Sequence, residues 1–312
     1  MPFANFFVYG SAQPGVPSVT QHYQGQTNIE LTEGFVINAA SDTARRGRAL
    51  IPPGAVAKGI DSAAKPVRAV GGFFAMSLDT FVAMFRPPFA MREFLTQTWF
   101  VARVSLLPTI LLSIPFTTLV VFILNVLLVE IGAADYSGSG AAIGTVNQIG
   151  PIVTVLVVAG AGATAMCADL GARTIREELD AMRVMGIDPV RALVVPRVLA
   201  GTLVALMLSA LVTMVGLGGS FGFSVFIQHV TPGAWVAGLT LLVGLADVII
   251  AMVKAALFGL AASLIACFKG TTVGGGPAGV GNAVNETVVY TFMALFAIDV
   301  IATAVGVKVS PK

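Results

Sequence analysis

Residues 173–185 read RTIREELDAMRVM and place six charged side chains in thirteen positions of an otherwise apolar chain. The chain as a whole is 56% hydrophobic and 11% charged over 312 residues. On either side of this stretch, residues 104–172 and 198–253 contain no Lys or Arg. Each charge at the centre of a lipid bilayer costs about 3 kcal/mol or more. The stretch therefore predicts a solvent-side helix held between two membrane spans.

The composition excludes several classes of protein. The chain holds 34 Gly and 20 Phe, far from a soluble globular average. A net charge of +2 argues against a nucleic-acid partner. The two histidines, His22 and His229, lie far apart in the sequence, which argues against a metal site and against a lipid-modifying enzyme. Cys167 and Cys267 are expected to be reduced, structurally silent thiols. The start of the chain lacks a basic region followed by an apolar one, so no cleavable signal is expected.

The N-terminal part divides into two expected segments. Residues 1–60 mix Gln, Gly, Pro, Ser and Thr without a helical period, and they predict an irregular extension. Residues 61–88 repeat apolar residues at helical spacing, with basic residues near both ends, and close on Pro87-Pro88. This pattern favours an amphipathic helix in the membrane interface. The alternative is a helix packed wholly against membrane spans.

Residues 89–312 predict an all-α integral membrane domain with five transmembrane helices. Arg92, Trp99 and Arg103 indicate an interfacial elbow before the first span. Gly-rich 274–281 indicates a turn between the last two spans. The spans are expected at residues 104–130, 147–169, 194–227, 235–268 and 285–307.

Basic residues orient these spans, because Lys and Arg accumulate in cytoplasmic loops. The loop after the second span holds five arginines, from Arg173 to Arg197. The loop at 131–146 has no basic residue, and the next outer loop, 229–234, has only His229. This asymmetry predicts a multi-pass plasma-membrane protein with a cytoplasmic N-terminus and an extracytoplasmic C-terminus.

The charged segment itself predicts one cytoplasmic helix over residues 172–186. Ile175, Leu179, Met182 and Met185 fall on one stripe, and Gly186 suits the C′ position that ends a helix. Asp188-Pro189 then suits the N-cap and first position of the next helix. A short helix with a Met-rich stripe is suited to docking in a groove of another protein. An ordinary solvated connecting helix is the alternative.

Two blocks of sequence carry a resemblance to a known family. The run REELDAMRVMGIDP at 176–189, followed by LVVPR at 193–197, resembles the signature of the MlaE/YrbE family of ABC-transporter permeases. The run GPAGVGNAVNETVV at 276–289 is similar to the family's entry to its last span. The resemblance covers about 65–308 and is closest to actinobacterial, mycobacterial-type YrbE subunits of Mce lipid-transport systems.

The resemblance implies a non-catalytic permease subunit that moves a lipid, with import as the implied direction. It implies a cytoplasmic ABC ATPase, a second YrbE-type permease in a homo- or heterodimer, and extracytoplasmic Mce proteins as partners. ATP and Mg²⁺ would bind the ATPase, because this chain has no phosphate-binding G-x-x-x-x-G-K-[ST] loop. The coupling helix that seats on the ATPase would comprise Arg173, Arg176, Glu177, Glu178, Asp180, Ala181, Met182, Met185 and Gly186.

Polar residues within the spans form a second group of candidates, as a possible substrate path: Asn125, Asp247 and Lys254. Asp247 and Lys254 lie seven residues apart, ~10.5 Å along one helix face, too far for a direct pair. They would carry the charge in an alternative function, an ion-coupled secondary transporter. A path lined by Phe, Leu, Val and Met suits fatty or mycolic acids, sterols and phospholipids alike.

Overall fold

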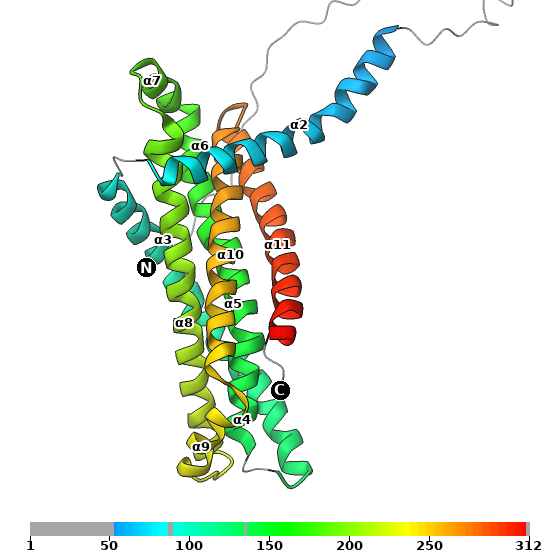
Figure 1. Ribbon diagram of the computed structural model, residues 1–312, viewed down its shortest axis with the longest axis vertical. Coiled ribbons are helices and arrows are strands. Elements are labelled where there is room, and N and C mark those ends of the chain that lie inside the picture. The colour runs from blue at the N-terminus through cyan, green and yellow to red at the C-terminus, as the bar shows by residue number, and fades with distance from the viewer. Residues whose placement is uncertain (1–52, 87–89, 134–135, 310–312) are drawn as a thin grey trace, which may run out of the picture. The chain divides into compact units, whose positions relative to one another are not determined.

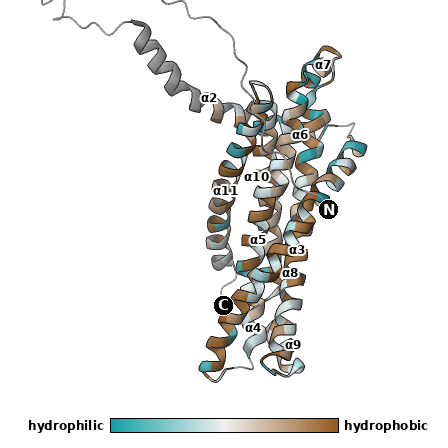
Figure 2. Cartoon of the chain, turned by 180° about the vertical axis from the view of Figure 1, so that it is seen from behind, coloured by the Kyte–Doolittle hydropathy of each residue, from teal (hydrophilic) through white to brown (hydrophobic). Residues whose placement is uncertain are grey.

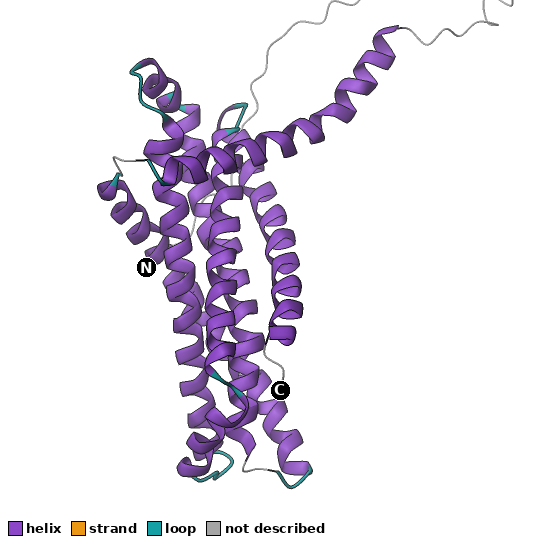
Figure 3. Cartoon of the chain, in the orientation of Figure 1, coloured by secondary structure: helices purple, strands orange, loops and turns teal. Residues whose placement is uncertain are grey.

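The computed structural model describes residues 53–86, 90–133 and 136–309, and every regular element in these ranges is helical (Figure 3). The chain divides into two compact units, residues 1–63 and 64–312, and the second unit contains everything described below except the start of the first helix. The elements are α2 (Pro53–Met84), α3 (Met91–Glu130), α4 (Ser137–Ile143), η2 (Gly144–Ile149), α5 (Gly150–Val157), η3 (Val158–Ala163), α6 (Thr164–Ile175), α7 (Glu178–Val184), η4 (Val190–Val194), α8 (Val195–Phe226), α9 (Pro232–Leu242), α10 (Leu245–Thr271) and α11 (Gly276–Val309), where η marks a π-helical segment.

Five helical runs in the described ranges are long and apolar enough to cross a membrane, judged by length and composition. They are Met91–Glu130, Ser137–Ile175, Val190–Phe226, Leu245–Thr271 and Gly276–Gly306. The prediction of an all-helical protein with five spans is confirmed. Figure 1 shows these helices running side by side, with α7 at one end of the bundle and α4 and α9 at the other.

Several predicted boundaries are wrong. The first helix begins before the expected residue 104, because α3 is helical from Met91 onward and contains Arg92, Trp99 and Arg103. The expected loop at 131–146 contains α4, which contacts α9 through the Ser139 hydroxyl and the Gly238 carbonyl at 2.7 Å. The expected fourth span is interrupted at residues 243–244, so that α9 is a separate short helix. Local apolar periodicity cannot detect the break at 243–244, because the residues on both sides of it are equally apolar.

The helix expected at 61–88 begins earlier, at Pro53, so the last part of the segment predicted to be irregular is helical. Residues 1–52 and the two closing prolines lie outside the described residues. In the second unit, the Phe73 ring of α2 packs edge to face on Phe268 of α10. Phe74 and Leu78 are 60% and 65% exposed. One face of α2 therefore packs on the bundle, while apolar side chains remain exposed on another.

In the first span, the buried and exposed positions are occupied in the opposite way to those of a helix in a soluble protein. Its buried positions recur at every fourth residue and are mostly small or polar: Gln97, Val101, Ser105, Thr109, Ser113, Thr117, Val121 and Asn125. The hydroxyls of Thr109 and Thr117 donate to the carbonyls four residues earlier, both at 2.6 Å. Large apolar residues such as Leu107 and Leu111 are instead exposed. Small polar residues inside and apolar residues outside are typical of helix packing in lipid.

The core of the bundle is built by close approach of α8 and α10. A Cβ atom added at Gly259 would lie 2.7 Å from the Gly201 carbonyl oxygen, so the two backbones meet where only glycine fits. Around this contact, Met166, Leu208, Phe258 and Leu295 are buried in one apolar cluster drawn from α6, α8, α10 and α11. Hydrophilic residues gather instead at the end that carries α7 (Figure 2).

Candidate functional site

The charged segment forms a helical hairpin rather than one helix. The predicted continuous helix over 172–186 is wrong, because α6 ends at Ile175 and α7 begins at Glu178. Glu177 between them adopts a left-handed conformation with φ +59°. Arg176 and Glu178 close the turn with an ion pair of 2.9 Å. The predicted helix is interrupted because a right-handed helix cannot continue through the left-handed conformation of Glu177.

The end of α7 follows the predicted pattern. Gly186 has φ +76°, and the N–H of Ile187 donates to the Met182 carbonyl at 2.9 Å. This is the Schellman arrangement that suits glycine at C′. Asp188 then accepts a hydrogen bond from the N–H of Val190 at 3.0 Å and caps the chain that continues into η4.

The apolar stripe of the hairpin divides between interior and surface. Leu179 is 4% exposed, and it packs with Met182 against a cluster that includes Leu193 and Val198. Met182 is only half-buried, so part of its side chain packs on η4 and α8 and part is left at the surface. The apolar side chains left on the outside are Val184, Met185 and Ile187, with exposures of 89%, 66% and 44%.

The charged residues of the hairpin also divide into two groups. Asp180 and Arg183 form a 2.8 Å ion pair with both side chains about two-thirds exposed, at 69% and 65%. Such surface pairs stabilise a fold by only ~0–1 kcal/mol, so their groups remain free to meet a partner. Glu177 and Ala181 are exposed as well. Arg173 differs, because its Nε lies 3.4 Å from the Asp169 carboxylate on the preceding turn of α6.

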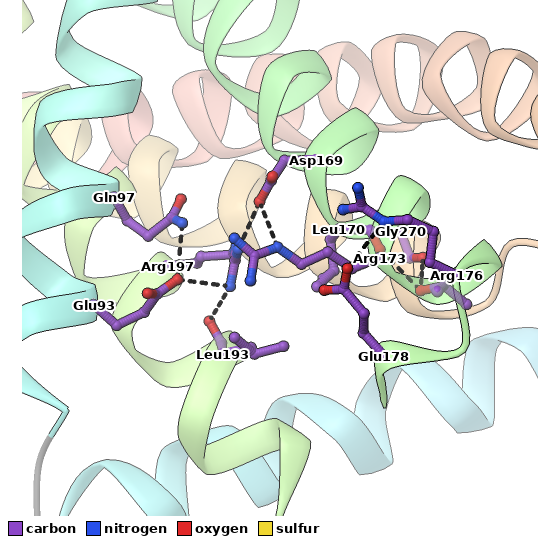
Figure 4. Close-up of polar contacts among 11 residues, drawn as sticks. Glu93, Gln97, Asp169, Leu170, Arg173, Arg176, Glu178, Leu193, Arg197 and Gly270 are labelled. Atoms are coloured by element: carbon purple, nitrogen blue, oxygen red, sulfur yellow. Dashed lines mark hydrogen bonds and ion pairs between the residues drawn. The ribbon is translucent and has the colours of Figure 1, made fainter. Parts of the chain in front are cut away.

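Asp169 belongs to a network of charges below the hairpin, shown in Figure 4. At its centre, the Arg197 guanidinium of α8 is fully buried, with its Nη2 atom 2.6 Å from the Asp169 Oδ2 atom. Its Nη1 atom lies 3.5 Å from Glu93 Oε1 of α3 and donates to the Leu193 carbonyl at 3.1 Å. In the sequence, Arg197 counted only as one of the five arginines of the predicted cytoplasmic loop and as part of the LVVPR run. Its two acidic partners were not predicted.

The second candidate group lies within the spans. Lys254 of α10 is 4% exposed, and its Nζ atom lies 3.1 Å from Asp299 Oδ1 and 2.7 Å from Thr303 Oγ1, both on α11. Asp247 instead accepts a hydrogen bond from the Gly244 N–H at 3.0 Å, at the start of α10. The two residues singled out in the sequence thus have separate partners, and the charge that balances Lys254 comes from another helix.

A cavity of about 340 Å³ connects these residues to the second span. Asp247, Lys254 and Thr303 lie on one side, and Asn147 and Gln148 come from the π-helical segment η2 on the other. A π-helical segment adds a residue to a turn and often occurs at functional sites. Here it lies directly before α5, which has Pro151 in its first turn. The cavity therefore brings charged and amide side chains together with apolar ones such as Ile143 and Ile250.

Asn125 does not line this cavity. Its Nδ2 atom donates to the Ser224 hydroxyl at 2.9 Å, and this contact joins α3 to α8.

The sequence did not lead us to Asp299 and Thr303, the two partners of Lys254. A usable signal existed for Asp299, because it is the single charged residue between positions 287 and 307. A lone acid in an apolar span calls for a buried partner.

The five spans, with a charged hairpin between the second and third, define a polytopic helical membrane protein. Residues 94–305 match the family described as Permease MlaE. That match covers more than half of the chain, and the chain therefore belongs to the MlaE permease family. The resemblance found in the sequence is confirmed at the level of this family.

Three relatives illustrate the similarity. A probable ABC transporter permease of Synechocystis sp. is 31% identical over 165 residues, which are 53% of this chain and 63% of that protein. A probable ABC transporter permease of Rickettsia conorii is 26% identical over 251 residues, 78% of this chain and 95% of the relative. The intermembrane phospholipid transport system permease protein MlaE of Haemophilus influenzae is 29% identical over 181 residues, 58% of this chain and 69% of the relative. The chain thus spans less than two thirds of the Synechocystis protein.

Proposed function

We propose that this chain is the membrane-spanning subunit of an ABC transporter that moves a lipid, and that a separate ATPase subunit hydrolyses the ATP. Membership of the MlaE permease family and two relatives named as ABC transporter permeases support this function. The observation that carries it is the hairpin at one end of the bundle. It presents exposed charges together with Val184, Met185 and Ile187 outside the spans.

The hairpin is suited to docking on a soluble partner. Exposed apolar side chains surrounded by charges are typical of protein interfaces. The hairpin is also held firmly, since Leu179 is buried and the Thr174 hydroxyl lies 2.9 Å from the Gly270 carbonyl of α10. A docking element that is fixed to the bundle can pass a displacement to the spans. This arrangement supports the role of the hairpin as the coupling element.

The substrate proposed is a lipid with an acidic or phosphate-bearing head group, of the fatty-acid or phospholipid class. One relative is named as a phospholipid transport permease. In this chain, the cavity offers the Lys254 ammonium, which is paired with Asp299. It also offers the Asn147 and Gln148 amides beside the Asp247 carboxylate, and the outer faces of the spans are apolar. We further propose an Mce-type assembly with a second permease subunit and import toward the cytoplasm, supported by the similarity of residues 276–289 to YrbE proteins.

The function is tested with the permease and its ATPase co-purified and reconstituted in liposomes that contain a fluorescent phospholipid. We expect ATP-dependent movement of the lipid, and none with an ATPase subunit that binds but does not hydrolyse ATP. Native mass spectrometry of the same complex identifies the co-purifying lipid. Movement driven by an ion gradient without ATP would instead support the secondary transporter that uses Asp247 and Lys254.

The proposed orientation places the hairpin in the cytoplasm and the α8–α9 connection outside. We expect a membrane-impermeant maleimide to label Thr231→Cys in intact cells and to label Arg183→Cys only after lysis, since both positions are exposed. The background is low because Cys167 and Cys267 are buried. Labelling of position 183 in intact cells would reverse the proposed orientation.

A further inference from the structure

The charge network around Arg197 joins three helices at the end of the bundle that carries the hairpin (Figure 4). Arg197 lies in the first turn of α8 and is fully buried. Asp169 comes from α6 and Glu93 from α3, and each is within ion-pair distance of the same guanidinium. A single side chain thus connects the first span, the third span and the helix that leads into the hairpin.

Both carboxylates are themselves held in place. The Gln97 amide donates to Glu93 Oε1 at 2.9 Å, one turn further along α3. The Arg173 Nε atom lies 3.4 Å from Asp169 Oδ2 on the side toward the hairpin. The planar guanidinium holds its donors in fixed directions toward the two carboxylates, whereas the three donors of an ammonium group rotate about one bond. The network therefore specifies the relative position of α3, α6 and α8.

Stability alone does not account for this network. Apolar side chains of similar volume commonly replace a buried ion cluster with no loss of stability. The network also leaves two buried atoms without a hydrogen-bond partner among the described residues, Arg197 Nε and Gln97 Oε1. A donor and an acceptor thus remain unused in one cluster. A small shift of α3 along α8 can exchange the acceptor offered to Arg197, which favours a second arrangement of the same groups.

The network is also placed to receive a displacement of the hairpin. Asp169 lies six residues before the end of α6, ~9 Å along the helix axis. The hairpin begins at that end, and α3 lies on the other side of Arg197. Movement that the hairpin imposes on α6 reaches α10 through Thr174 and Gly270. It reaches α3 through Asp169, Arg197 and Glu93.

We propose that Arg197 is a positioning residue that couples movement of the hairpin to the first span. When the ATPase displaces the hairpin, α6 moves with it, and Arg197 transmits this movement to α3. The first span then shifts relative to the other spans. Without this link, the movement would end at the contact between α6 and α8. This inference rests on the proposed function. It assigns to the Glu93–Arg197–Asp169 cluster the step between ATP hydrolysis and opening of the lipid path.

The test measures lipid moved per ATP hydrolysed in the reconstituted complex, with Glu93→Gln as the main variant. The side chain of Glu93 is 26% exposed, so its neutral isostere disturbs the fold less than changes at Arg197. We expect ATPase co-purification to be retained and lipid moved per ATP to fall about tenfold, a usual size for coupling between sites. Hydrolysis without matching lipid movement is a readout that a purely structural role would not produce.

The matched control is Glu286→Gln, which removes a carboxylate from the 2.6 Å ion pair with Lys269 between α10 and α11. We expect it to change lipid moved per ATP by less than about twofold, because the Glu286 side chain is 56% exposed and such pairs contribute little. An equal loss in both variants, or an unchanged ratio in Glu93→Gln, would overturn the inference.

Two substitutions at Arg197 complete the test. Arg197→Lys keeps the charge but loses the planar fork, and we expect a ratio between those of the wild type and Arg197→Gln. Should Arg197→Gln fail to fold, Glu93→Gln and Arg197→Lys decide the question. Failure of the wild-type complex to move lipid with ATP would contradict the proposed function. An active wild type with an unchanged ratio in Glu93→Gln contradicts this inference alone.

Discussion

Replacing Glu178 and Asp180 together by lysine is expected to release the ATPase from the purified permease, with recovery falling about tenfold or more, ~1.4 kcal/mol of binding free energy. Both residues form ion pairs on the hairpin, with Arg176 and Arg183. The double reversal places like charges opposite each other and changes the surface charge by four units. Basic groups on the partner would then be repelled. The side chains of Glu178 and Asp180 are 41% and 69% exposed, so the spans should insert and fold normally in the double variant.

The measurement is a pull-down of the ATPase from detergent extracts, with the amount of folded permease checked by size-exclusion chromatography. Glu130→Lys, an exposed reversal where α3 ends, is the control and should leave recovery of the ATPase unchanged. Full recovery of the ATPase with the double variant would mean that the docking element lies elsewhere in the chain.

Gly186 allows the same surface to be tested through its backbone. A β-branched residue resists a φ of +76°, so Gly186→Val should misplace Met185 and Ile187 while leaving every charge in place. Gly186→Asn is the matched control, because asparagine tolerates the left-handed conformation. We expect weaker ATPase recovery with valine than with asparagine. Equal recovery of the ATPase with the two variants would show that the direction in which Met185 and Ile187 point does not matter for docking.

Replacing Lys254 by methionine is expected to destabilise the protein by about 3 kcal/mol, the lower end of the cost of breaking a buried ion pair. The lower end applies because the Asp299 side chain is 23% exposed, so its charge is not fully buried. Asp299 would lose its charge partner, and Thr303 would lose the donor that lies 2.7 Å away. The measurement is thermal unfolding in detergent, followed by lipid transport per folded complex.

A second variant separates stability from function at this site. Lys254→Met combined with Asp299→Leu removes both charges and should recover most of the lost stability, because no unpaired charge remains. We expect lipid transport per folded complex to stay about tenfold low, since the cation beside the cavity is absent. Recovery of transport together with stability would show that the pair serves only to join α10 to α11.

The charged segment, residues 173–185, illustrates which features could be predicted from the sequence and which could not. Its placement outside the spans followed from the cost of burying charge, and its ends at Gly186 and Asp188 followed from capping chemistry. The break at Glu177 did not follow, because REELDAM has good helix formers on both sides of the turn. The burial of Leu179 and the packing of the half-buried Met182 beside it could not be predicted either. An apolar stripe packs equally well on its own bundle or on a partner, and only the position of η4 and α8 decides between them.

Hydropathy, charge and motif spacing are local properties of the chain, and they were enough to predict five spans, a charged segment between the second and third of them, and the family. The tertiary structure alone decided which charges meet. Lys254 pairs with Asp299, 45 residues away, and Arg197 pairs with Asp169, 28 residues away. Such partners depend on the rotation and depth of one packed helix against another. A shift of one residue turns a side chain by about 100° around its helix, so no local pattern can specify these pairs.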